Sequence, residues 1–182
     1  HLLTKQRQII IVGGGPAGLM AADVLSAVYS VSLYEKKKSI GKKFLLAGKG
    51  SFNITNCAQG ADLSNNYLPA GFMDNALTGF DTLDLRQWLS EMGISTLVGS
   101  SGRIFPDKEI RPVDVLNAIK EKLGRQGVLF NLEHEFAGIE GRHVTFKNQG
   151  KEVVLEPDYC LFALGGASWP ATGSTGLWRP LF

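Results

Sequence analysis

A glycine-rich turn near the start of the chain restricts the fold more than any other feature of the sequence. The β-branched run at residues 8–12 suits a buried strand, and three glycines at the spacing G-x-G-x-x-G follow it, Gly13, Gly15 and Gly18. In such turns the first glycine permits the bend, the second lets the backbone approach a pyrophosphate, and the third lets the next helix pack closely. The turn therefore predicts a phosphate-binding site at the start of a helix.

An acidic residue stands at the distance that this kind of turn requires. Glu35 ends a second apolar run 17 positions after Gly18, where a carboxylate accepts hydrogen bonds from the ribose hydroxyls of an adenosine. A helix predicted from Pro16 to about Ala27 joins the two strands, so residues 8–35 form one βαβ unit. The glycine spacing alone is weak evidence, because such a turn can serve packing only. Strand, helix and acid together favour a dinucleotide.

Composition limits the other classes of function. A chain of 182 residues with 44% hydrophobic residues can bury the core of one domain, and its net charge of +2 does not favour nucleic acid or a membrane surface. Cys57 and Cys160 show no metal-ligand or dithiol spacing, so no metal is expected. No membrane span and no signal peptide are recognisable. We expect a soluble cytoplasmic protein in which His134 and His143 lie at the surface.

The middle of the chain predicts a helical and loop insert over residues 57–126. Asp81 or Asp84 suits the start of a helix that stops at Gly93, and Pro112 suits the first turn of a second helix. Before the insert, a glycine- and lysine-rich stretch to Asn56 shows neither helical nor strand periodicity. We expect an ordered loop there.

The last third of the chain changes to a period of two. Residues 128–155 predict a small antiparallel β segment, with a hairpin turn at 148–150. An unbroken apolar run at 159–164 then predicts a return strand buried on both faces, which stops at Gly165 and Gly166, where a second close backbone approach is expected. The fold class is α/β, a Rossmann-like parallel sheet with a small antiparallel insertion, in one domain over residues 1–182.

Four stretches in order, GGGPAGLMAA, GKKFLLAGKGSFNITN, GRIFP and ALGGASWPATGSTG, together resemble a known family. They are similar to the N-terminal part of bacterial FAD-dependent flavoproteins of the YhiN-like or BaiN-type group. This resemblance implies a Rossmann-like FAD-binding domain and FAD as the cofactor. It also implies a C-terminally truncated fragment, inactive by itself, whose flavin-side wall would follow Phe182.

The resemblance extends the candidate site beyond the glycine turn. The family's loop after the acid lies along the dinucleotide, and its cysteine is replaced here by Phe52. A backbone N–H and C=O at Phe136 correspond to the groups that hold the adenine edge. No catalytic residue is recognisable. The candidate cofactor-binding residues are Gly13, Gly15, Pro16, Ala17, Gly18, Glu35, Lys36, Gly41, Lys42, Lys43, Asn53, Asn56, Phe136, Gly165 and Gly166.

Three functions stay open at this point. The first is an FAD-dependent oxidoreductase, a reductase or oxidase of a small molecule, with NAD(P)H as a candidate electron donor. The second is an NAD(P)-binding dehydrogenase domain. The third is a non-catalytic or RNA-modification-related flavin-binding module, against which the low net charge counts.

Overall fold

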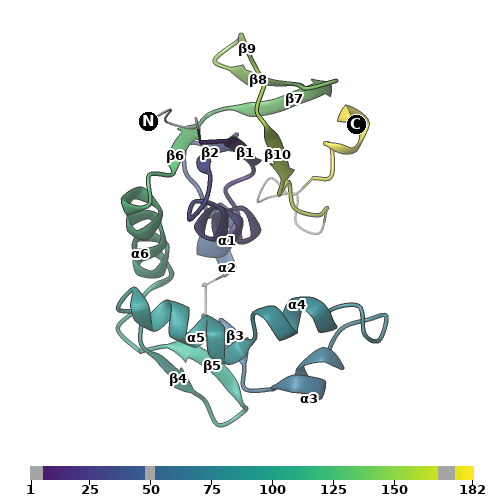
Figure 1. Ribbon diagram of the computed structural model, residues 1–182. Coiled ribbons are helices and arrows are strands. Elements are labelled where there is room, and N and C mark those ends of the chain that lie inside the picture. The colour runs from purple at the N-terminus through teal and green to yellow at the C-terminus, as the bar shows by residue number, and fades with distance from the viewer. Residues whose placement is uncertain (1–5, 48–51, 168–174) are drawn as a thin grey trace, which may run out of the picture. The chain divides into compact units, whose positions relative to one another are not determined.

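The computed structural model describes residues 6–47, 52–167 and 175–182, which form two compact units (Figure 1). Unit 1 comprises residues 1–46 and 120–182, and unit 2 comprises residues 47–119. Two helices, α2 (Lys42–Ala47) and α6 (Pro112–Arg125), each cross a boundary between the units. A compact unit need not be a domain, so the single domain expected from the sequence and its insert at 57–126 stay predictions.

Unit 1 is built on a four-stranded parallel sheet. Helix α1 (Pro16–Leu25) connects the two central strands, which gives the predicted βαβ unit and confirms the Rossmann-type fold class. The apolar run of the first strand is buried from Ile9 to Val12, as expected for a strand covered on both faces. In spatial order the strands are β10 (Tyr159–Phe162), β1 (Gln8–Val12), β2 (Ser30–Glu35) and β6 (Leu129–Leu132).

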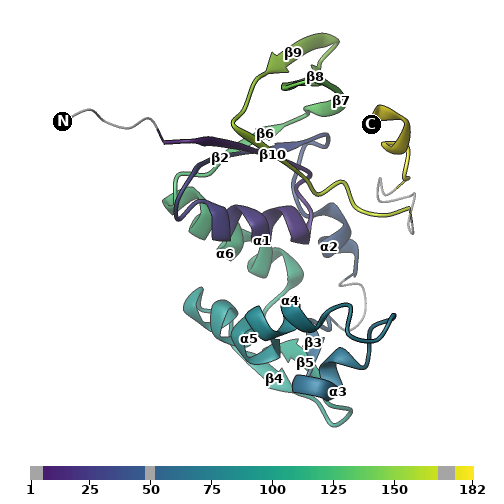
Figure 2. The ribbon, with the colours of Figure 1, turned by 45° about the vertical axis from the view of Figure 1, so that its right-hand side comes forward.

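Three layers make up unit 1 (Figure 2). Helix α1 lies on one face of the parallel sheet, and a small antiparallel sheet lies on the other. Ile10 and Val12 of β1 point to the second face, where they form one buried cluster with Phe136, Val144 and Phe146. The antiparallel strands, in spatial order, are β7 (Glu135–Glu140), β8 (His143–Asn148) and β9 (Lys151–Leu155).

Two features of residues 128–155 differ from the sequence-based expectation. Strand β6 belongs to the parallel sheet and pairs with β2, so the antiparallel segment begins only at Glu135. Because β6 is an edge strand with exposed Leu129, it lacks the unbroken burial by which a central parallel strand is recognised. Of the two histidines expected at the surface, His143 is exposed, whereas His134 is half-buried and bonded. The hairpin turn lies where it was predicted, with Gln149 and Gly150 both at positive φ (48° and 81°).

Unit 2 contains a three-stranded antiparallel sheet and short helices (Figure 1). Asp81 caps α5, since its carboxylate accepts from the N–H groups of Leu83 (2.7 Å) and Asp84 (3.0 Å), and Asp84 bonds back to the N–H of Asp81 (2.9 Å). The first of the two candidate caps is therefore the residue used. The elements are β3 (Thr55–Asn56), α3 (Gly60–Ser64), α4 (Asp74–Gly79), α5 (Thr82–Glu91), β4 (Thr96–Val98) and β5 (Arg103–Pro106).

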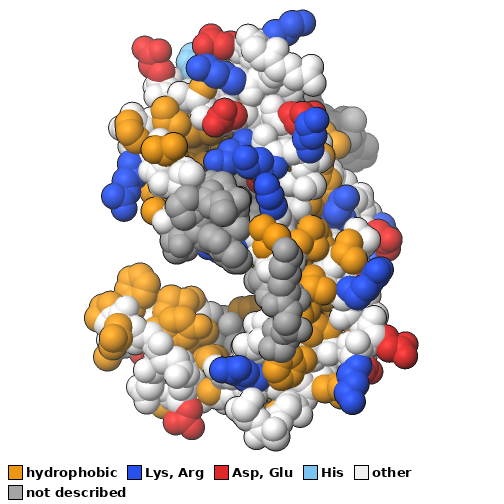
Figure 3. All heavy atoms as spheres, turned by 180° about the vertical axis from the view of Figure 1, so that it is seen from behind, with side chains coloured by type: hydrophobic (Ala, Val, Ile, Leu, Met, Phe, Trp, Pro, Cys, Tyr) orange, Lys and Arg blue, Asp and Glu red, His pale blue; other side chains and the backbone are white. Residues whose placement is uncertain are grey.

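The loop expected after Glu35 contains a helix instead. Residues 42–47, KKFLLA, form α2 directly after Gly41, because lysine, leucine and alanine favour helix and their pattern was obscured by flanking glycines. Residues 57–79, for which the sequence predicts no particular helix or strand, form α3 and α4 and leave Leu68 (89%) and Phe72 (72%) exposed. Figure 3 shows such hydrophobic side chains gathered on part of the surface. Within the described ranges, no helix is long and apolar enough to cross a membrane.

Candidate functional site

The glycine turn packs so tightly that two of its positions admit no side chain. Gly13 adopts φ +112°, and a Cβ there would lie 2.3 Å from the carbonyl oxygen of Ala163. A Cβ on Gly18 would lie 1.9 Å from the carbonyl oxygen of Gly13. Both distances are far below contact distance, so the turn fits between α1 and the residues after β10 only as glycine. The structural reasons predicted for Gly13 and Gly18 are therefore present.

Gly15 is different, because open space surrounds it. Apart from Gly15 and its two chain neighbours, no atom of the described residues lies within 4 Å of the place where its Cβ would be, although it is the N-cap residue of α1. Pro16 has no N–H, and among the described residues no protein acceptor is recorded for the N–H groups of Gly15, Ala17 and Gly18. The first turn of α1 also holds no acidic residue. Unpaired N–H groups beside open space at a helix start can bind an anion.

Glu35 closes the other side of the turn. Its Oε2 accepts a hydrogen bond from the N–H of Gly14 (2.8 Å), and its Oε1 accepts one from the N–H of Lys37 (2.9 Å). A carboxylate oxygen has two acceptor sites. Each oxygen of Glu35 therefore keeps one site for a further donor such as a ribose hydroxyl, while the two backbone bonds fix its direction.

Gly14 is a site residue that the spacing argument missed. A Cβ there would lie 2.7 Å from Cγ2 of the buried Ile40 and 3.2 Å from Oε2 of Glu35. Its carbonyl oxygen accepts from the N–H of Gly41 (2.8 Å), which has φ +66°. Because Gly14 is the middle residue of an unbroken Gly-Gly-Gly run, that run was a signal for a tightly packed turn.

The three lysines expected near the cofactor each lie close in sequence to a residue that contacts the glycine turn. Lys42 and Lys43 are exposed and begin α2 directly after Gly41, which itself contacts the turn. Lys36 is exposed beside Glu35. Lys36 and Lys42 are thus the sequence neighbours of two residues that contact the turn, Glu35 and Gly41, and the role of the three lysines in cofactor binding stays a prediction.

The second glycine pair lies after β10, at the same end of the parallel sheet. The N–H of Ala163 donates to the carbonyl of Val12 (2.8 Å), so the close backbone approach occurs two residues before the pair. The regular strand ends at Phe162, whereas the sequence predicted it to Leu164. Gly165 adopts φ +74°, and its carbonyl accepts from Nε1 of Trp178 (3.1 Å). Gly166 follows this bend, and the cofactor role of the pair stays a prediction.

Phe136 of β7 contributes its side chain to the core. The side chain is 6% exposed and its ring lies 5.0 Å from that of Phe162 and 6.3 Å from that of Phe146. The β7–β8 register shifts between Phe136 and Gly138. A β-bulge of this kind frees backbone groups from the ladder. Only the backbone of this segment is thus left for the predicted adenine contact.

Asn53 and Asn56 belong to unit 2, where both make local bonds. In the orientation that satisfies both amide atoms, Nδ2 of Asn53 donates to the carbonyls of Thr55 (2.6 Å) and Ile104 (3.1 Å). Oδ1 of Asn56 accepts from the N–H of Ala58 (2.9 Å), an Asx turn. Their predicted cofactor contacts stay predictions, and their visible role is to shape unit 2.

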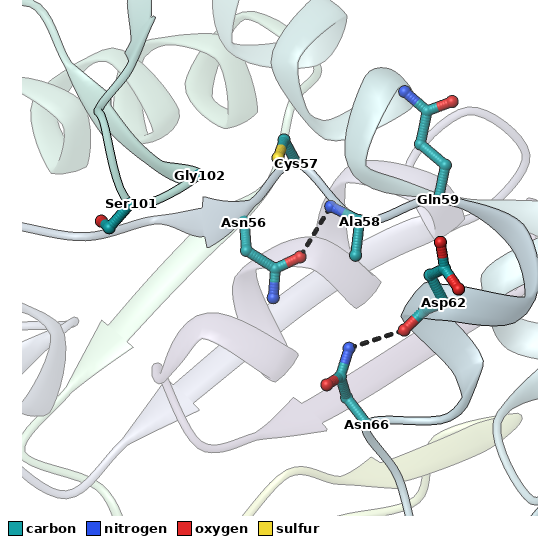
Figure 4. A pocket seen from close by; sticks show the side chains of 8 residues that line it. All are labelled: Asn56, Cys57, Ala58, Gln59, Asp62, Asn66, Ser101 and Gly102. Carbon is teal, nitrogen blue, oxygen red and sulfur yellow. Dashed lines mark hydrogen bonds between the residues drawn. The ribbon is translucent and has the colours of Figure 1, made fainter.

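An open polar pocket lies within unit 2 (Figure 4). Its volume is about 560 Å³, and Asn56 lines it with its amide nitrogen directed away from the Asx turn. Nδ2 of Asn66 donates to the carbonyl of Asp62 (2.8 Å), which leaves Oδ1 as an acceptor. Such a lining offers donors and acceptors to a small polar molecule. Its residues are Asn56, Cys57, Ala58, Gln59, Asp62, Asn66, Ser101 and Gly102.

The fold and the glycine turn define a dinucleotide-binding Rossmann domain. Residues 7–182 match the model of the HI0933-like protein Rossmann domain, so the chain belongs to the HI0933-like family. This is a family of FAD-dependent oxidoreductases, which confirms the resemblance seen in the sequence and FAD as the family's cofactor. The observed turn fits that cofactor, because Gly15 leaves open space for a pyrophosphate and Glu35 keeps acceptor sites for a ribose.

Two curated relatives show how wide the family is. The chain is 27% identical over 180 residues to a ribosomal RNA dihydrouridine synthase of Haemophilus influenzae, covering 95% of this chain and 44% of that protein. It is 28% identical over 176 residues to a 3-dehydro-bile acid Δ4,6-reductase of Clostridium scindens, covering 93% and 41%. The chain thus spans less than half the length of these relatives.

Solved structures support the fold alone. A 3-ketosteroid-Δ4-(5α)-dehydrogenase of Rhodococcus jostii is similar with a TM-score of 0.65 at 14% identity, over 91% of this chain and 47% of that one. THI4 of Thermovibrio ammonificans is similar with a TM-score of 0.61 at 19% identity, over 95% and 62%.

Proposed function

We propose that this chain holds the adenosine and pyrophosphate part of FAD in an oxidoreductase that reduces or oxidises a small molecule. The pyrophosphate lies at the start of α1 against the N–H groups of Gly15, Ala17 and Gly18. The ribose lies against the carboxylate of Glu35. When bound, FAD supplies the hydride or electron transfer, and the residues of this chain bind and orient it.

The observation that carries this proposal is the contrast among the three glycines. Side chains at Gly13 and Gly18 would collide with the protein itself, whereas a Cβ at Gly15 would have no atom within 4 Å among the described residues beyond its chain neighbours. Packing alone gives no reason for a glycine at a position surrounded by open space. A pyrophosphate that approaches the backbone there does give one.

The remaining candidate contacts complete the proposal. Lys42 and Lys43, at the start of α2, attract the negatively charged dinucleotide. The backbone N–H and C=O near Phe136 bind the adenine edge. Asn53, Asn56, Gly165 and Gly166 are the other proposed contacts with the cofactor. NAD(P)H is the proposed electron donor.

The substrate class follows from the relatives only in outline. One relative's name refers to a bile acid and another's to ribosomal RNA. We propose a small-molecule substrate, since the net charge is +2 and basic and acidic side chains are interspersed on the face that Figure 3 shows. A turnover assay that compares an unmodified RNA fragment with small-molecule substrates tests this choice, and faster turnover of the RNA would overturn it.

The cofactor assignment is tested by Gly15→Val in the full-length protein. We expect at least about a 100-fold loss of FAD affinity with little change in thermal unfolding of the apoprotein, because the valine blocks the phosphate and not the protein. Gly124→Val is the matched control, since Gly124 also has no atom within 4 Å of its Cβ position and lies in α6. Retention of FAD by Gly15→Val, or release of NAD from the purified protein on denaturation, would contradict the proposal.

A further inference from the structure

The segment that carries Glu35 is held in place by a turn nearly a hundred residues later in the chain. The carbonyl of Glu35 accepts from the N–H of His134 (3.0 Å), and the carbonyl of Lys37 accepts from the N–H of Glu133 (3.1 Å). These bonds continue the pairing of β2 with β6 beyond the ends of both strands. The turn thereby fixes Lys37, whose own N–H donates to the Glu35 carboxylate.

The backbone of this turn is unusual. Glu133 adopts φ +59°, and among the described residues only it and Gln149 combine a side chain with a positive φ. Gln149 lies in a hairpin that needs this conformation. Glu133 lies in no such hairpin, and its conformation coincides with two successive N–H groups donating to the Glu35 segment. Strained residues of this kind persist where the surrounding structure over-determines them, often at binding sites.

The ring of His134 anchors the turn. Its Nδ1 lies 2.7 Å from the carbonyl oxygen of Leu132, and since a carbonyl only accepts, Nδ1 carries the hydrogen. Nδ2 of Asn148, at the end of β8, lies 3.0 Å from both ring nitrogens, and with the hydrogen on Nδ1 only Nε2 can accept from it. The ring also meets Tyr34 edge-on, with centroids 5.4 Å apart. His134 therefore ties the turn both to the parallel sheet and to the antiparallel sheet.

We propose that His134 is a positioning residue for the ribose of the bound dinucleotide, acting through the backbone of Glu35 and Lys37. The inference rests on the proposed function, in which Glu35 accepts from the ribose hydroxyls. His134 itself does not touch the ligand. It holds the carboxylate in the direction that the ribose needs, and loss of its ring lets the Glu35–Lys37 segment shift.

The test compares two ligands of the full-length apoprotein by calorimetry, ADP and 2′,3′-dideoxy-ADP, which lacks both ribose hydroxyls. Wild type should prefer ADP by about 10- to 100-fold, the expected gain from hydrogen bonds to a carboxylate. His134→Ala should lower this preference about three- to tenfold, the size of coupling between residues in one network. The Kd of the dideoxy ligand should stay unchanged, which a merely structural defect would not allow.

Three further variants make the outcome decisive. His134→Asn should restore most of the preference, since its amide nitrogen can donate to Leu132 in place of Nδ1. His143→Ala, an exposed histidine on the same antiparallel sheet, is the control and should keep the full preference. Glu35→Ala should abolish the preference. If Glu35→Ala leaves it intact, the ribose assignment of the proposed function fails. If Glu35→Ala abolishes it while His134→Ala changes nothing, or weakens both ligands equally, the role of His134 is overturned.

Discussion

Units 1 and 2 fix their polar groups in different ways. In unit 1 the candidate site is almost entirely backbone, with the Gly13–Gly18 turn seated against Ala163 and Gly41. In unit 2 the polar groups are side chains that bond to their own neighbourhood, as Asn53 and Asn56 do. Packed backbone at Gly13 and Gly18 leaves no room for a Cβ, whereas a surface of local side-chain bonds can change residue by residue. Unit 1 should therefore be the more sensitive to substitution.

The largest difference is expected between glycines. Gly18→Ala places a Cβ 1.9 Å from the carbonyl oxygen of Gly13, and we expect it to destabilise unit 1 by about 3 kcal/mol and to abolish FAD binding. Gly79→Ala in α4 meets no atom within 4 Å and should be neutral or stabilise by up to about 1 kcal/mol. Urea unfolding of both variants measures the difference, and equal midpoints would show that the turn relaxes easily.

The two cysteines provide a chemical comparison of the units. Burial raises the pKa of the Cys160 thiol in β10 to about 11, whereas Cys57 of unit 2 is exposed. A rise from 9.0 to about 11 lowers the thiolate fraction of Cys160 about 100-fold at pH 8. Iodoacetamide should therefore label Cys57 well before Cys160, as read by peptide mass spectrometry over time.

The raised pKa of Cys160 also makes the stability of the folded protein depend on pH. A thiol whose pKa is raised by folding contributes stability below pH 9, and this contribution is lost as the pH rises toward about 11. Labelling in concentrated urea should remove the difference in rate between the two thiols. Rapid labelling of Cys160 in the folded protein at pH 8 would show that β10 opens locally.

The sequence predicted unit 1 better than unit 2, for a physical reason. The βαβ unit needs fixed spacings between the glycines and Glu35, and those spacings are legible without knowledge of the partner strands. Gly14 and His134 each act through a hydrogen bond to Glu35. The bond from His134 joins two residues that lie far apart in the chain. Such a pairing leaves no local pattern.

Most of the helices and strands that the sequence did not predict correctly are short. Helices α3 and α4 have five and six residues, too few for a helical period to emerge from polar sequence. Strand β6 was assigned to the wrong sheet because an edge strand lacks the unbroken burial of a central parallel strand. The cap of α5 was predictable, since it depends on two aspartates three positions apart.

That cap gives a prediction of intermediate size for unit 2. Asp81→Ala removes two bonds to the first turn of α5 and should destabilise the protein by about 1 kcal/mol. Asp84→Ala removes only the reciprocal bond and should cost about half as much. Chemical denaturation of both variants checks the order. If Asp84→Ala is the more harmful, the capping carboxylate has been assigned to the wrong residue.

The smallest effect is expected at the start of α6. Arg111 donates to Asp114 from Nε and Nη2, each at 2.9 Å, and its backbone N–H donates to the same carboxylate at 2.9 Å. The side-chain bonds from Arg111 lead the causes that lower the pKa of Asp114 from 3.8 to about 2. Because folding lowers this pKa, the pair contributes stability above pH 4, which is lost as the pH falls toward 2.

Solvent exposure limits how much this pair contributes. Both side chains are substantially exposed, so water and salt screen their interaction and the loss of stability in acid should be small. Carbon-detected NMR titration of the Asp114 carboxyl should place its midpoint near pH 2, and Arg111→Gln should return it toward the ordinary value. A midpoint that does not move in Arg111→Gln would mean that the backbone bond alone holds the carboxylate, and that this part of unit 2 too depends on backbone, as unit 1 does.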